Sequence, residues 1–262
     1  MRKGILLLVF IILVVKLSAV GLTLNTSATQ NAANGLIFLA QSPSGTSLNP
    51  AYQYQGVESG VTYLFNFHDL PYYTLHLSSI RNAWGFYLGG CHLAHPLYKE
   101  TNINLSLNYR RNFFAVGTSL RFMHNRVSDY HNAHAFIADA GFIVYYDNII
   151  TGFSIKNLTQ TRFQGYKLPV VLIWEMSYSL SDNSSLSLGL EKERNYDFSF
   201  KIGTYYRLHS YIALLSSYQY EPDRIGAGVK LLPSPLRISY SILTHRYLSP
   251  THYFSLTYGF RN

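Results

Sequence analysis

Residues 101–122 read TNINLSLNYRRNFFAVGTSLRF, and this stretch decides the fold. Its first half alternates Ile, Leu, Leu and Tyr with Asn, Ser and Asn, and its second half alternates large apolar residues with Ala, Gly and Ser. A period of two is that of a β-strand and not of a helix. The Arg-Arg-Asn between the halves is turn material, so the stretch predicts an antiparallel hairpin with one apolar face.

The same pattern recurs over most of the chain. About fourteen segments show it, starting near residues 61, 72, 83, 101, 112, 134, 149, 168, 184, 197, 210, 224, 236 and 251. Turn residues separate them, for example PSP at 233–235 and EKERNYD at 191–197. Alternation of this kind fits either a soluble sandwich or a membrane barrel.

Composition distinguishes the two folds. Only 13% of the residues are charged, against roughly 25% in a soluble domain, while 16% are aromatic. One face of the segments carries large apolar side chains and the other carries Gly, Ser and Thr. This is typical of a barrel with lipid outside and a polar lumen inside. An open sheet edge in hydrocarbon would leave backbone groups unpaired at several kcal/mol each. We therefore predict an all-β fold, a closed antiparallel transmembrane β-barrel of about 14 strands.

The chain divides into three parts. Residues 1–20 have the layout of a secretory signal peptide, with a basic start, an apolar run and small residues, although an uncleaved anchor helix is an alternative. Residues 21–57 are polar, lack a sustained period and are expected to form a hatch; residues 58–262 form the barrel. Removal of the first part takes the formal charge from +8 to +5, because it contains three cations.

The residue inventory excludes several functions. One cysteine excludes a disulfide framework and a multi-thiolate zinc site. The pairs His92/His95 and His131/His134 are three apart, which places the two rings on opposite faces of a strand, so we expect no metal site and no cofactor. Serine lies in no Gly-x-Ser-x-Gly elbow, so we expect no enzyme. Aromatics outnumber cations about two to one, which does not indicate a nucleic-acid partner.

Alternation places seven charged side chains in the lumen. They are five cations and two acids: Arg121, Lys156, Lys201, Lys230, Arg237, Asp139 and Glu175. The expected hatch has no acid of its own, which leaves an excess of about three positive charges. Water and hatch carbonyls can solvate that excess, or it can attract an anionic head group such as a carboxylate. Both interpretations stay open at this point.

The segment Asn31–Ala51 resembles the N-terminal region of the FadL/PorV-like superfamily of outer-membrane proteins. That layout is N-A-x-x-G-x-x-x-x-A-x-x-P-S-x-x-x-x-N-P-A, and the matching residues here are Asn31, Ala32, Gly35, Ala40, Pro43, Ser44, Asn49, Pro50 and Ala51. The resemblance covers most of the mature chain and implies a luminal hatch, with Asn49, Pro50 and Ala51 at its exit into a fourteen-stranded barrel. At 262 residues the chain is short for this superfamily.

The resemblance implies transport or secretion across the bacterial outer membrane, after export through the Sec pathway. One form is passage of a hydrophobic or anionic small molecule. Another is a partner-binding scaffold or shuttle of the PorV/PorQ type, associated with type IX secretion components, and a third is a structural barrel without channel activity. Other expected partners are outer-membrane lipid, lipopolysaccharide and the barrel-assembly machinery. Phe254, Leu256, Tyr258 and Phe260 follow a period of two that resembles the C-terminal signal read by that machinery, from which the chain departs by the tail Arg261-Asn262.

Overall fold

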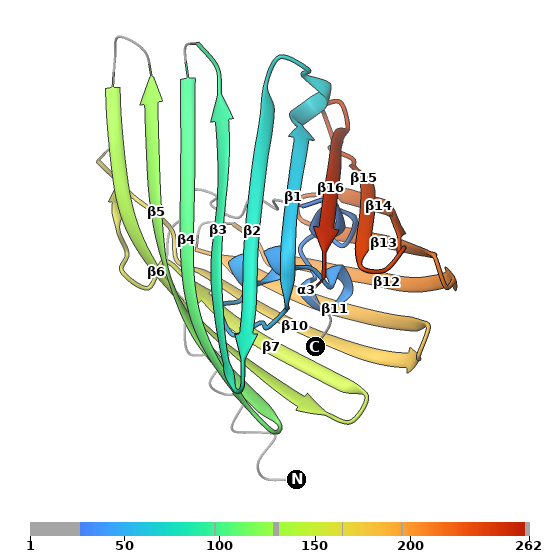
Figure 1. The fold of residues 1–262 in the computed structure, drawn as a ribbon. Helices are drawn as coiled ribbons and strands as arrows, with labels where there is room; N and C mark the ends of the chain where they lie inside the picture. The colour runs from blue at the N-terminus through green and yellow to red at the C-terminus, as the bar shows by residue number, and fades with distance from the viewer. Residues whose placement is uncertain (1–26, 97, 128–130, 164, 195, 260–262) are drawn as a thin grey trace.

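The computed structural model describes residues 27–96, 98–127, 131–163, 165–194 and 196–259, so the expected signal peptide and Phe260 lie outside the described residues. Fourteen strands close into one antiparallel barrel, which confirms the predicted fold class (Figure 1). Each strand pairs with its neighbour along the chain, and β1 closes the barrel against β16. The barrel strands are β1 (Gly56–Tyr63), β2 (Pro71–Arg81), β3 (Trp84–Ala94), β4 (Tyr98–Arg111), β5 (Phe114–Val127), β6 (His131–Tyr146), β7 (Ile149–Lys156), β10 (Val171–Ser181), β11 (Ser184–Glu193), β12 (Ser199–His209), β13 (Ile212–Tyr220), β14 (Arg224–Leu231), β15 (Leu236–Leu243) and β16 (Thr251–Tyr258).

The two faces of the wall differ as the alternation predicts. On β4 and β5, Leu105 and Leu120 lie directly opposite each other and are 53% and 51% exposed on the outside of the barrel. Their chain neighbours Asn104 and Ser119 point inward and are buried. An apolar outer surface around a polar lumen suits a chain whose external solvent is lipid.

The two ends of the barrel carry different connections. At the end where β1 begins, two-residue turns such as 82–83, 112–113 and 147–148 join the strands. Asn82, Asn112 and Asp147 have positive φ there, a conformation that Asn and Asp tolerate. The connections at the other end include 64–70, 157–170 and 244–250, and we call it the loop end. Short turns at one end and longer loops at the other are the usual arrangement of outer-membrane barrels.

Three short helical segments lie inside the barrel (Figure 1, blue): α2 (Ala28–Ala32), α3 (Ile37–Ala40) and the 3₁₀ turn η1 (Pro43–Ser47). Leu36 and Leu39 pack on Tyr205 and Leu215 of the wall, while α3 and the chain after η1 pack on a second wall cluster around Ile143. The expected hatch therefore occupies the lumen. β1 begins at Gly56, two residues before the expected start of the barrel at residue 58.

Within the described residues, no helix combines the length and apolarity needed to cross a bilayer.

Candidate functional site

The Asn49-Pro50-Ala51 segment forms a compact turn at the end of the hatch. The side-chain oxygen of Asn49 accepts the backbone N–H of Ala51 at 3.0 Å, which is an Asx-type turn. The wall residue Asn108 donates through its side-chain nitrogen to the carbonyl of Pro50 at 3.0 Å. The segment is thus held both by its own side chain and by β4.

Two glycines of the barrel wall allow this segment to pack closely against it. Gly117 of β5 and Gly141 of β6 are direct partners across the sheet. A Cβ on Gly117 would lie 2.2 Å from the carbonyl oxygen of Pro50, and one on Gly141 would lie 2.0 Å from the side-chain oxygen of Asn49. A side chain at Gly117 would displace the backbone of Pro50, and one at Gly141 would displace the Asn49 side chain that makes the turn bond.

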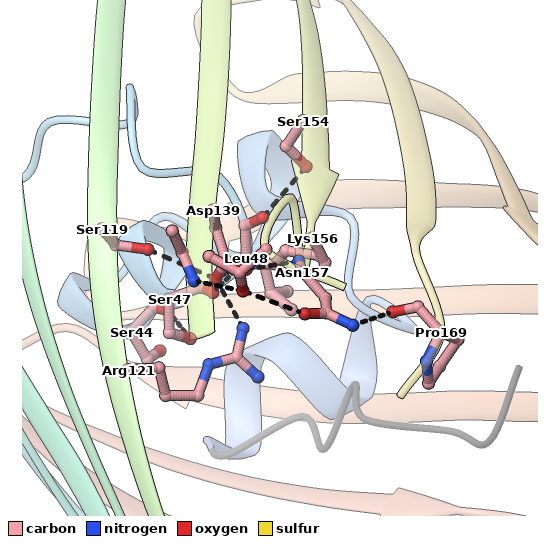
Figure 2. Close-up of polar contacts among 12 residues, drawn as sticks. Ser44, Ser47, Leu48, Ser119, Arg121, Asp139, Ser154, Lys156, Asn157 and Pro169 are labelled. Atoms are coloured by element: carbon pink, nitrogen blue, oxygen red, sulfur yellow. Dashed lines mark hydrogen bonds and ion pairs between the residues drawn. The ribbon is translucent and has the colours of Figure 1, made fainter. Parts of the chain in front are cut away.

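A cluster of charges surrounds Asp139 of β6 (Figure 2). Its carboxylate, in a residue that is 1% exposed, accepts hydrogen bonds from Arg121 at 2.5 Å and from Lys156 at 3.1 Å. The backbone N–H of Asn157 donates to the second oxygen at 2.8 Å, and Ser119 adds a hydroxyl at 3.2 Å. One buried carboxylate therefore ties together β5, β6 and the end of β7.

The cluster extends to the hatch. The ammonium of Lys156 also donates to the carbonyl of Ser47 at 2.5 Å, and the hydroxyl of Ser154 donates to the carbonyl of Leu48 at 3.0 Å (Figure 2). Both carbonyls lie at the end of η1, where helical carbonyls lack internal partners. Asp139 neutralises the lysine that holds the hatch, so this cluster is an anchor between hatch and wall.

A second anchor holds the two ends of α3. Glu175 of β10 accepts the backbone N–H groups of Ile37 at 2.8 Å and Phe38 at 2.9 Å. Lys230 of β14 donates to the carbonyl of Ala40 at 2.9 Å. A carboxylate at the N-terminus and an ammonium at the C-terminus satisfy the free backbone groups and complement the helix dipole. Two residues far apart in sequence thus clamp one turn of helix.

The other predicted luminal charges lie apart from these anchors. Lys201 pairs with Glu191 at 2.7 Å, and Arg237 donates to the hydroxyl of Tyr54. Glu191 and the fully buried Glu58 are among the luminal acids that the sequence analysis left out. Glu191 belongs to a segment that was assigned to a turn, and Glu58 precedes the expected start of the first strand. Every predicted luminal cation has a polar partner in the protein, so charge balance alone does not require an anionic ligand.

The wall beside Asp139 is irregular. β7 pairs with β6 only from Ala140 to Tyr146 and ends there, although β6 continues toward the loop end. The chain after β7 then covers β6 through isolated bonds, from the N–H of Leu158 to the carbonyl of Ala138 at 2.8 Å and from the hydroxyl of Thr161 to the carbonyl of Phe136 at 2.6 Å. It carries a small separate hairpin before β10 begins: β8 (Arg162–Phe163) and β9 (Tyr166–Lys167).

Asn157 holds the two ends of this connecting segment together. Its side-chain nitrogen donates to the carbonyls of Leu168 and Pro169 at 2.8 and 2.9 Å. Between the loop-end part of β6 and β10, the barrel wall is therefore closed by this connecting segment, without paired strands. Among the residues that the structure describes, no three His, Cys, Asp or Glu side chains gather in a way that could hold a metal ion.

The chain forms a closed fourteen-stranded antiparallel barrel with an N-terminal hatch in its lumen. This is the FadL-type fold of outer-membrane barrels. A FadL homologue from Pseudomonas aeruginosa matches with a TM-score of 0.60 and 12% identity, over 91% of this chain and 99% of that chain. The toluene transporter TodX of Pseudomonas putida matches with a TM-score of 0.62 and 10% identity, over 94% and 100% of the two chains.

The CymD monoaromatic hydrocarbon channel gives a TM-score of 0.62 at 11% identity, over 91% of this chain and 98% of its own. No protein-family model and no curated protein matches the sequence. At sequence identities this low, the matches show a shared fold and nothing more specific.

Proposed function

We propose that the protein lets small hydrophobic molecules pass the outer membrane. The observation that carries the proposal is the irregular wall between β6 and β10, which lies directly beside the hatch anchor at Asp139. Separating two hydrogen-bonded strands in hydrocarbon costs much free energy, because every backbone group must stay paired there. A connecting segment held by a few bonds can move at lower cost, and it faces the lipid in which a hydrophobic molecule dissolves.

The same carboxylate joins this segment to the hatch. Asp139 accepts the N–H of Asn157, the first residue of the connecting segment, and it also pairs with Lys156, which holds the carbonyl of Ser47. Displacement of the segment therefore disturbs the bond that seats the hatch. The fold supports the same class of function, since solved structures with this fold are described as a toluene transporter and a monoaromatic hydrocarbon channel.

Uptake by whole cells tests the proposal. Cells that express the protein should take up labelled toluene or a labelled long-chain fatty acid faster than cells without it, and should not take up a sugar of similar size faster. Asn157→Gly removes the side-chain bonds of the connecting segment and suits the positive φ at this residue. We expect it to raise uptake, while the matched variant Asn112→Gly, at a positive-φ turn of the opposite end, leaves uptake unchanged.

Uptake equal to that of cells without the protein would refute the proposal. In that case, recovery of secretion-machinery components with the purified protein would favour a secretion scaffold of the PorV type, and their absence a structural barrel.

A further inference from the structure

Two exposed cations face each other on the outside of the barrel at the loop end. Lys99 of β4 and Arg126 of β5 are direct partners across the sheet, and both point away from the lumen. Like charges directly opposite each other destabilise a pair of strands. Among the residues that the structure describes, neither side chain has an ion pair. The arrangement favours an anion that binds both.

Histidines extend this cationic pair into a band across four strands. His124 of β5 and His134 of β6 are direct partners, and His92 of β3 is two strands away, bonded to the hydroxyl of Thr101 at 2.9 Å. All three rings lie on the outer face, as Lys99 and Arg126 do. The described outward positions of β3, β4, β5 and β6 contain no Asp or Glu, so no carboxylate on this face would repel an anion.

An apolar groove lies on the same outer face, toward the middle of the strands. Its volume is about 780 Å³, and Leu88, Leu105 and Leu120 are among the side chains that line it. The small outward residues Thr118 and Ala138 deepen it between the leucines. Its lining surface is almost entirely apolar, which suits hydrocarbon chains.

The spacing between band and groove matches a lipid. Leu105 follows Lys99 by six positions on β4, which is roughly 20 Å along the strand at about 3.3 Å per residue and about 15 Å along the membrane normal at the usual strand tilt of about 40°. One leaflet of a bilayer has an acyl layer about 15 Å deep, half of the roughly 30 Å hydrocarbon core. A lipid whose head group lies at the cationic band therefore reaches the groove with its chains.

We propose that this face binds a phosphorylated lipid of the surrounding leaflet, namely the lipid A part of lipopolysaccharide. With the short turns facing the periplasm, the loop end faces the cell exterior, where this lipid forms the leaflet. One phosphate lies between Lys99 and Arg126 in charge-assisted hydrogen bonds, His92, His124 and His134 donate further bonds, and acyl chains fill the groove.

Binding of purified lipopolysaccharide to the detergent-solubilised protein, followed by native mass spectrometry, tests the proposal. The double variant Lys99→Gln/Arg126→Gln should bind about thirtyfold more weakly, because each basic residue near an anionic lipid surface contributes about a factor of five. The matched control Arg81→Gln/Arg111→Gln removes two exposed outward arginines at the opposite end and should change affinity less than twofold.

A second variant separates the groove from the charges. Ala138→Trp fills the groove and leaves the cationic band intact, so it should weaken lipopolysaccharide without weakening a phosphorylated sugar that lacks acyl chains. Heat-modifiable gel migration shows that each variant is folded. Equal affinity in the two double variants, or equal binding of a zwitterionic phospholipid, would overturn the proposal.

Discussion

Replacing Asp139 with asparagine tests whether the buried charge cluster holds hatch and wall together. The carboxylate accepts from Arg121, Lys156, Ser119 and the backbone of Asn157. Asparagine has nearly the same size but carries no charge and offers only one acceptor atom. The variant therefore removes the negative charge that Asp139 supplies to Lys156 and Arg121, two cations that lie close together in the lumen.

The expected loss of stability follows from burial. Removing one partner of a buried ion pair destabilises a protein by about 3–5 kcal/mol, because the remaining charge is left poorly solvated. The side chain of Lys156 is 3% exposed and that of Arg121 is 13% exposed, so the arginine regains some water. We expect the free energy of unfolding to fall by about 3 kcal/mol, the lower end of this range.

The matched control is Glu191→Gln, which breaks the pair with Lys201. Those side chains are 15% and 10% exposed, and the contact does not involve the hatch. Because glutamine still accepts a hydrogen bond from Lys201 and only one cation loses its counter-ion, we expect a smaller loss of about 1.5 kcal/mol.

Equilibrium urea unfolding in lipid vesicles, followed by fluorescence of Trp84 and Trp174, measures both losses. The double variant Asp139→Asn/Lys156→Met should recover at least about 1 kcal/mol, because it also removes the buried ammonium that lost its carboxylate partner. If Asp139→Asn cost no more than Glu191→Gln, or if the double variant showed no recovery, the cluster would not be an anchor.

Three further changes probe the seat of the hatch. Gly141→Ala should lower stability by roughly 2 kcal/mol and expose the hatch to protease. The control Gly90→Ala, whose nearest contact for a Cβ is 3.1 Å away, should cost less than half of that. Equal losses would argue against close contact between the hatch and the wall at Gly141. Lys230→Met removes the clamp at the end of α3 and should increase the frequency of channel openings in planar bilayers; an unchanged, silent bilayer would contradict this. Asn49→Ala should cost about 1 kcal/mol by loss of its turn bond, measured by urea unfolding, and no change would show that wall contacts alone hold the turn.

Much of the barrel could be predicted from the sequence. The alternation identifies which side chain points outward and which inward on each strand, because strand geometry fixes the period at two. For that reason all seven predicted luminal charges, from Arg121 to Arg237, lie on the inner face of the wall. The number of strands also follows, since fourteen apolar segments can be counted between turns.

The sequence by itself determined the faces of the strands, and only the tertiary structure decided which residues meet across the lumen. Periodicity carries no information on which charge meets which part of the hatch. Glu175 and Lys230 reach the two ends of α3 from two strands that are not neighbours, β10 and β14. The seat of the Asn49-Pro50-Ala51 turn likewise depends on the register that sets Gly117 beside Gly141. Register, strand length and the path of an aperiodic hatch follow from packing in three dimensions, which a local pattern does not encode.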